Sequence, residues 1–120
     1  MKVAIIGSRN LTVEHLDKYL PQNTTEIVSG GAVGIDKCAK KFAHEQKIAF
    51  TEFLPQYSLY GKRAALIRDA LIADYADIVI AFWDGESHGT AYTIKCAREL
   101  GKIVYIYVKA DTDSSYVLLS

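Results

Sequence analysis

The sequence predicts an α/β fold: a three-layer Rossmann-like sandwich in which about five mostly parallel strands carry helices on both faces. Short apolar segments alternate with longer segments of helical periodicity, which is the pattern of a parallel sheet with crossover helices. Half of the 120 residues are hydrophobic, so the chain can bury the core of one domain over residues 1–120. We expect the strand order 3-2-1-4-5 with right-handed crossovers.

Four of the predicted strands are apolar without alternation, which is typical of strands buried on both faces of a sheet. The segment 48–54 is weaker and is predicted to lie nearer an edge. The last ten residues, 111–120, leave three alternatives open: their apolar end suits an edge strand, a surface docked on a partner or a frayed tail. In chain order, the predicted strands are residues 3–6, 26–29, 48–54, 76–82 and 103–108.

Helical segments separate these strands. The first, 11–20, is short and is followed by Pro21. Each of the other three carries an apolar stripe at helical spacing, which predicts the face that packs on the sheet. Gly101 is expected to end the last helix. The stripes are Ile35, Cys38, Ala39 and Phe42 within 34–46, Ala64, Ile67, Leu71 and Tyr75 within 62–75, and Ala91, Ile94, Ala97 and Leu100 within 90–100.

Composition limits the class of protein. Lys plus Arg and Asp plus Glu each number 14, so the net charge is zero, which argues against nucleic acid as a partner held by a broad basic field. No apolar run has the length of a membrane span, and the first residues lack a signal-peptide pattern, so we expect a cytoplasmic protein without membrane contact. Cys38 and Cys96 are predicted to be reduced core residues. No metal-ligand spacing occurs, and neither a metal nor a cofactor is predicted.

The loops that follow the strands are rich in glycine. In an open α/β sheet, ligands bind beyond the carboxyl ends of the strands, where strand order reverses. Glycine lets the backbone approach a ligand, and the next helix start offers free N–H groups and a partial positive charge to phosphate. The alternative is that these glycines serve only tight turns and packing. The loops are GSRN at 7–10, SGGAVG at 29–34, PQYSLYG at 55–61 and WDGESHGT at 83–90.

Two better-known phosphate sites are absent from the sequence. No GxGxxG follows the first strand, and no GxxxxGK[ST] motif occurs. The first absence argues against a standard NAD domain, and the second excludes a P-loop NTPase.

Charged and aromatic residues in these loops suggest roles toward a ligand. Arg9 and Arg68 suit a phosphate, because a guanidinium donates hydrogen bonds in pairs, although a solvated surface position is the alternative. Asp36 would bind ribose hydroxyls or simply favour its helix dipole. Asp84 and Glu86 would bind ribose, act in acid–base chemistry or cap the next helix. The aromatic residues Trp83, Tyr57 and Tyr60 would stack on a base or pack beside the strand ends.

Four segments in this order resemble the SLOG superfamily, which includes the Smf/DprA DNA-processing proteins and the "lonely guy" phosphoribohydrolases. The similarity is greatest to its small single-domain branch related to the YspA and YpsA proteins. The segments are MKVAIIGSRN, SGGAVGID, IRDALIADYADIVIAFWDGESHGT and GKIVYIY. The resemblance implies a Rossmann-like fold that binds nucleotides or nucleotide-derived ligands, with a homodimer as one option. It implies site roles for Gly7, Ser8, Arg9, Gly30, Gly31, Asp36, Arg68, Asp69, Asp84, Gly85, Ser87, Gly89 and Thr90.

The sequence departs from the phosphoribohydrolase branch, whose motif resembles PGGxGTxxE. Trp83 stands at the place of the proline, and Thr93 at the place of the glutamate. Cleavage of a glycosidic bond needs a carboxylate, and Asp84 or Glu86 would have to supply it if the protein is an enzyme. The residues leave that question open.

We therefore rank three hypotheses. The first is binding of a nucleotide-like small molecule, as in a sensor. The second is a nucleotide phosphoribohydrolase or related base-releasing N-glycosidase. The third is a DprA-like nucleic-acid processing factor, which the absence of an obvious basic stripe disfavours.

Overall fold

The protein forms one six-stranded sheet with helices on both faces. The structure is a computed structural model, and it describes residues 1–110 and 115–120. The strand order is β3-β2-β1-β4-β5-β6, and every pairing is parallel except that of β5 with β6. The predicted order 3-2-1-4-5 is thus confirmed and extended by one edge strand. The strands are β1 (Lys2–Gly7), β2 (Glu26–Ser29), β3 (Ala49–Glu52), β4 (Ile78–Trp83), β5 (Ile103–Lys109) and β6 (Tyr116–Leu118).

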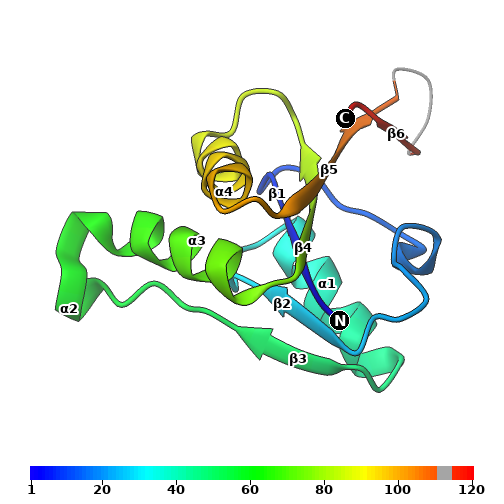
Figure 1. The fold of residues 1–120 in the computed structure, drawn as a ribbon, viewed down its shortest axis with the longest axis horizontal. Helices are drawn as coiled ribbons and strands as arrows, with labels where there is room; N and C mark the ends of the chain where they lie inside the picture. Colours follow the sequence, from blue (N-terminus) through cyan, green and yellow to red (C-terminus); the bar gives the residue numbers. More distant parts are fainter. Residues whose placement is uncertain (111–114) are drawn as a thin grey trace.

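The helices divide between the two faces of the sheet (Figure 1). The helix α1 packs on β1, β2 and β3, whereas α3 and α4 pack against each other and over the opposite face. This confirms the three-layer sandwich. The helical elements are η1 (Leu16–Lys18), α1 (Ile35–Glu45), α2 (Tyr57–Tyr60), η2 (Gly61–Arg63), α3 (Ala64–Tyr75) and α4 (His88–Glu99). None of the described helices is long and apolar enough to span a membrane.

The central pair of strands positions the loops that matter most. In the parallel pairing of β1 with β4, Gly7 lies opposite Phe82. The next residue, Ser8, donates its backbone N–H to the carbonyl of Phe82 at 3.0 Å. Because the chain reverses strand order here, the loops after β1 and β4 leave the sheet side by side.

Two helix predictions need correction. The short helix predicted at 11–20 is only the 3₁₀ turn η1, because His15 just before it has a left-handed φ of 55°. The face predicted for α3 is also partly wrong, since Leu71 is 48% exposed. Its buried residues are Ala64, Asp69, Ile72 and Ala73. Apolar residues of α3 lie on several sides of the helix, so their spacing in the sequence did not define the buried face. On α4, Leu100 is likewise exposed.

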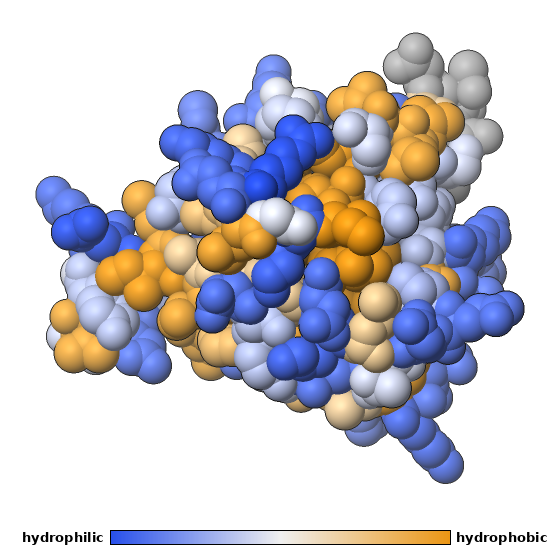
Figure 2. Space-filling model, viewed as in Figure 1, coloured by the Kyte–Doolittle hydropathy of each residue, from blue (hydrophilic) through white to orange (hydrophobic). Residues whose placement is uncertain are grey.

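The edge of the sheet beyond β4 is more exposed than predicted. Strand β5 is not buried on both faces. Ile103 is 57% exposed on the α1 side of the sheet, because α1 covers β1, β2 and β3 and leaves β5 uncovered. Figure 2 shows hydrophobic surface near the centre of the view, beside the place where Figure 1 draws β4 and β5. Within the tail, β6 confirms the edge-strand alternative, while residues 111–114 lie outside the described part of the chain. Cys38 and Cys96 are free, as predicted, but only half-buried.

Gly101 behaves as predicted. It follows α4 with a φ of 75°, and its N–H donates to the carbonyl of Arg98 at 3.0 Å. Lys102 N–H donates to the carbonyl of Ala97 at 2.9 Å, which completes a Schellman motif.

Candidate ligand-binding site

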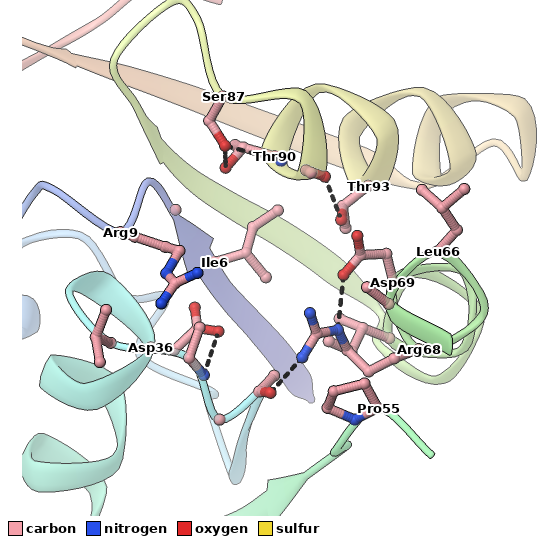
Figure 3. Close-up of a pocket in the computed structure, with 18 of the residues that line it drawn as sticks. Ile6, Arg9, Asp36, Pro55, Leu66, Arg68, Asp69, Ser87, Thr90 and Thr93 are labelled. Carbon is pink, nitrogen blue, oxygen red and sulfur yellow. Dashed lines mark hydrogen bonds and ion pairs between the residues drawn. The ribbon is translucent and has the colours of Figure 1, made fainter. Parts of the chain in front are cut away.

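A cavity of about 560 Å³ lies at the carboxyl ends of the strands. It is bounded by the loops after β1 and β2 and by the first turns of α1, α3 and α4 (Figure 3). This is the place where the strand order predicts a ligand. Its lining residues are Ile6, Gly7, Arg9, Gly30, Gly31, Ala32, Val33, Asp36, Pro55, Tyr57, Ala65, Leu66, Arg68, Asp69, Ile72, Ser87, Gly89, Thr90 and Thr93.

Arg68 ties α3 to the loop after β2. Its Nη1 donates to the carbonyl oxygen of Gly30, and its Nε donates to Oδ1 of Asp69 at 2.8 Å. The side chain of Arg68 is 14% exposed. Both contacts belong to the protein itself, so this guanidinium holds the cavity wall together and keeps its remaining N–H groups for a ligand.

Asp69 is buried in the cavity wall. Burial raises its pKa to about 6, although the Arg68 guanidinium acts in the opposite direction. One carboxylate oxygen is held by Arg68. The other, Oδ2, lies 3.7 Å from the position that a Cβ at residue 89 would occupy, so it faces the start of α4. This side chain is therefore an acid that titrates near neutral pH and has one oxygen directed at the cavity.

Asp36 forms the opposite side of the cavity, in the first turn of α1. Its Oδ2 accepts the backbone N–H of Ala32 at 3.2 Å. Burial raises its pKa, since the residue is only 7% exposed. This carboxylate lies in the first turn of α1 and bonds the loop before it, so it already places a negative charge at the positive end of that helix dipole.

The start of α4 is arranged differently. Ser87 is the N-cap residue, and its Oγ accepts the N–H of Thr90 at 3.4 Å. Within the helix, the hydroxyl of Thr93 donates to the carbonyl of Gly89 at 3.0 Å. No acidic residue lies in the first turn. The positive end of this helix dipole therefore faces the cavity without a carboxylate of its own helix beside it.

Arg9, unlike Arg68, is a cationic residue of the cavity that no other described residue holds in place. It follows β1, is exposed, and extends into the cavity (Figure 3). Among the described residues its guanidinium has no hydrogen bond or ion pair. Its five N–H donors are therefore available to an anion that enters between the loops after β1 and β4.

Hydrogen bonds of Trp83 and Asp84 stabilise the conformation of the loop after β4. Asp84 accepts the backbone N–H groups of Glu86 and Ser87 at 2.9 and 2.8 Å, and these hydrogen bonds lower its pKa. Its own N–H donates to Oγ of Ser8 at 3.0 Å, and the indole N–H of Trp83 donates to the carbonyl of Ser87 at 3.1 Å. Asp84 therefore serves the turn that precedes α4.

Most of the residues predicted for the site lie around this one cavity. The residues that line it are Gly7, Arg9, Gly30, Gly31, Asp36, Arg68, Asp69, Ser87, Gly89 and Thr90. The predicted residues that do not line it are Ser8, Trp83, Asp84, Gly85 and Glu86.

Sequence reasoning did not assign Thr93 or the apolar residues of the cavity to the site. Thr93 stood out only as a departure from the glutamate of a related motif. The apolar lining residues are Ile6, Ala32, Val33, Pro55, Ala65, Leu66 and Ile72, and none of them differs in type from a core residue.

The fold defines a Rossmann-like α/β domain with its cavity at the strand-order reversal. Residues 1–56, which hold β1, β2, α1 and β3, match the family model of DNA recombination-mediator protein A. This match supports a relationship to the SLOG superfamily at that coarse level and does not distinguish its single-domain branch. Comparisons with curated proteins and with solved structures found no match.

Proposed function

We propose that the cavity binds a nucleotide or a nucleotide-derived ligand, as a sensor domain does. The observation that carries this proposal is that Arg9 and the first turn of α4 face the same cavity. A guanidinium without a partner among the described residues and a helix N-terminus without an acid in its first turn face one cavity. Both features favour a phosphate group.

The two sides of the cavity suggest how the ligand lies. A phosphate at the start of α4 lies away from Asp36, whose carboxylate is in the first turn of α1, but lies beside Asp69, whose raised pKa favours the neutral acid that can donate to it. Ribose hydroxyls or amino groups of a base can donate to Asp36 or Asp69. Tyr57 is 61% exposed at the rim of the cavity and offers a ring for stacking on a base.

Ligand-induced stabilisation tests this proposal. AMP, GMP, CMP, UMP and ADP-ribose should each be compared with adenosine, which lacks the phosphate. We expect at least one phosphate-bearing compound to raise the melting temperature by mass action, and adenosine to have a much smaller effect. If none of these compounds raises it, the proposal is wrong.

Replacement of Arg9 separates binding from folding. Arg9→Ala removes a charge-assisted contact worth roughly 1.5–3 kcal/mol, so the Kd of the nucleotide should rise at least about tenfold. The melting temperature without ligand should not change, because Arg9 makes no bond to other described side chains. Arg63→Ala is the matched control, since Arg63 is exposed and does not line the cavity. Equal affinities in the two variants would contradict the role of Arg9.

A second candidate, hydrolysis of an N-glycosidic bond, is favoured by Asp69. Its free carboxylate oxygen faces the cavity and its pKa of about 6 lets it exchange a proton near neutral pH. In this reaction a water oxygen bonds to C1′ of the ribose, the C–N bond breaks, and its electron pair leaves with the base. Asp69 accepts the water proton and returns it to the base, giving free base and a ribose phosphate. Asp84 is less suited, because its carboxylate caps the loop.

Chromatography of nucleotides after incubation tests this candidate. If it holds, free base appears with the unaltered protein and is lost in Asp69→Asn, whereas nucleotide binding remains. Asp69→Asn keeps the size of the side chain and an oxygen for Arg68, so it is a fair isostere. Binding without any free base would eliminate hydrolysis and leave the binding proposal standing.

A third candidate, action on DNA, is favoured by the family model that residues 1–56 match, whose description is DNA recombination-mediator protein A. Single-stranded DNA would then bind with an affinity that falls steeply as salt rises. A mobility-shift titration at two salt concentrations measures this. Binding of nucleotides together with an absence of any DNA shift would exclude it.

A further inference from the structure

The surface between α1 and β3 has a composition that the candidate site does not explain. A stripe of basic residues, which we call the α1 basic stripe, lies along α1 at positions i, i+3, i+4 and i+7, so its members share one face of the helix. The sequence analysis found no obvious basic stripe, but the helix brings these residues onto one face. The stripe consists of Lys37, Lys40, Lys41 and His44, all exposed.

The net charge of this surface is positive although that of the whole chain is zero. Within the described residues, the only ion pair of the stripe joins Lys40 to Glu52, with 3.6 Å between Nζ and Oε1. Lys37 and Lys41 have no acidic partner there. An anionic partner would therefore meet uncompensated positive charge.

A hollow of about 490 Å³ lies beside the stripe and has apolar side chains within it. The residues that line it are those of the stripe together with Ile48 and Phe50. Both of these are half-buried and pack against the core cluster on the α1 side of the sheet. The hollow thus offers an apolar contact in the middle and lysine ammonium groups at its rim.

The third feature is an open strand edge. Strand β3 is the outermost strand and pairs only with β2 (Figure 1). Phe53 N–H donates to the carbonyl of Ser29 at 2.9 Å, and Ser29 lies opposite Glu52. In a parallel ladder alternate residues bond to the same neighbour, so Phe50 and Glu52 direct their N–H and C=O groups away from β2. No other described backbone group bonds to them, so they can pair with another chain.

We propose that β3 and the α1 basic stripe together form a docking site for an extended peptide that alternates acidic and apolar side chains on one face. The peptide would add a strand to the outer edge of β3, with main-chain hydrogen bonds to Phe50 and Glu52. Every second side chain would then point toward α1. An apolar one fills the hollow beside Phe50, and carboxylates meet Lys37 and Lys41.

Charge complementarity and the free edge select this partner over others. Lysines beside an edge repel a basic strand and lose hydration without gaining a partner under a neutral one, so an acidic strand is the one they favour. A nucleic acid could use the lysines, but it cannot pair with the N–H and C=O groups of β3. The hollow and the candidate cavity share no lining residue, and this proposal does not depend on the nucleotide proposal.

The test is fluorescence anisotropy with a labelled peptide of repeating order Asp-Thr-Phe-Thr, at low salt and pH 7. A matched peptide with Lys in place of Asp and a single-stranded dT20 oligonucleotide serve as competing ligands. We expect binding of the acidic peptide alone. The double variant Lys37→Glu/Lys41→Glu should weaken it at least about tenfold, whereas Lys62→Glu/Lys95→Glu, with the same charge change outside the hollow, should not.

A second pair of variants isolates the strand edge. Glu52→Pro removes an outward N–H and leaves the ladder to β2 intact, as prolines on edge strands do. Glu52→Ala keeps the N–H and removes the same carboxylate. We expect Glu52→Pro to bind the acidic peptide at least about fivefold more weakly than Glu52→Ala, with equal melting temperatures. Equal affinity in this pair overturns strand addition, and so does equal affinity for the two peptides. Binding of dT20 without the acidic peptide overturns the choice of partner.

Discussion

The starts of α1 and α4, two of the three that border the cavity, look alike in sequence and differ in structure. Both follow a strand and a glycine-bearing loop, yet the loop before α1 is filled by the protein and the loop before α4 is open. A Cβ at Gly34 would lie 2.5 Å from the carbonyl oxygen of Arg9, and one at Gly31 would lie 2.4 Å from Cδ2 of Leu54. At Gly85 a Cβ would meet nothing within 4 Å, and at Gly89 only Asp69, at 3.7 Å.

The electrostatics differ in the same direction. The start of α1 carries Asp36 in its first turn, bonded to the N–H of Ala32, and Gly34 offers no side-chain cap. The first turn of α4 contains no acidic residue and is capped by the neutral hydroxyl of Ser87, and the carboxylate that faces it is that of Asp69 from α3. Gly31 and Gly34 before α1 therefore serve close packing, whereas Gly89 in the first turn of α4 leaves open space at the cavity. A glycine-rich loop is evidence for a phosphate site only when its surroundings leave it empty.

The largest expected effect is that of Gly34→Ala on stability. Gly34 and Gly101 both have a positive φ, of 76° and 75°, but the ψ of −124° at Gly34 lies outside the left-handed region, so alanine is more strained there than in the Schellman motif of Gly101. Only Gly34 also has backbone oxygens within 2.8 Å of the added carbon, while Gly101 has open space. We expect Gly34→Ala to lower the free energy of unfolding by about 2–5 kcal/mol and Gly101→Ala by about 1–2 kcal/mol. Denaturant titration measures both, and equal losses would mean that the loop before α1 is not tightly packed.

The next effect concerns Asp69 and pH. Its pKa is raised from 3.8 to about 6, so the folded state binds a proton that the unfolded state releases between these values. Stability from this group is fully present below about pH 4 and is lost as pH rises through 6, a difference of roughly 3 kcal/mol. Asp69→Asn should remove this part of the pH dependence and leave the part due to Asp36. The melting temperature of the wild type and that of Asp69→Asn are compared at pH 4.5 and 7.5. An equal change in both proteins would contradict the assignment of this pH dependence to Asp69.

Much of the fold could be predicted, because the central strands have no polar alternation and strand order follows the rule for crossovers. Ile35 and Ala39 identified the buried face of α1 correctly, since lysines surround them. On α3, Leu66 and Leu71 are as apolar as Ile72, and so the apolar pattern did not show that Asp69 faces inward, although the resemblance to the SLOG superfamily implied a site role for it. Which apolar residue is buried depends on the neighbouring helix, and the pattern of a single helix does not contain that information.

The loop after β4 shows the same limit for the site. Asp84 and Glu86 were natural candidates for acid–base chemistry from their position in the loop. The structure gives the carboxylate of Asp84 two backbone N–H donors of its own loop, and Asp69 from α3 reaches the cavity instead. The contacts between α3 and α4 determine which carboxylate reaches the cavity. They bring together residues twenty positions apart in the sequence.

A smaller effect is expected at Gly89, where the open start of α4 can be filled. Gly89→Val adds a three-carbon isopropyl group to the cavity wall with no backbone strain, because this glycine has no positive φ. If a phosphate occupies that place, its Kd should rise about tenfold while the melting temperature without ligand stays the same or increases. Gly85→Val is the contrasting variant, since Gly85 has a φ of 84° and does not line the cavity. It should lose stability and keep affinity; the opposite pattern would mean that the phosphate lies elsewhere.

The smallest effect, at Ser87, separates the two roles of the α4 start. Ser87→Ala removes the hydroxyl that accepts the N–H of Thr90, and the 3.4 Å length of that bond places the loss near 0.5–1 kcal/mol. Ser87→Asp keeps an N-cap acceptor and favours the helix dipole, so it should retain stability. It also gives α4 the kind of charge that Asp36 gives α1. An anionic ligand should then bind Ser87→Asp much more weakly than Ser87→Ala, as measured by calorimetry with the best nucleotide. If both variants bind it equally, the difference between the two helix starts does not determine where the phosphate lies.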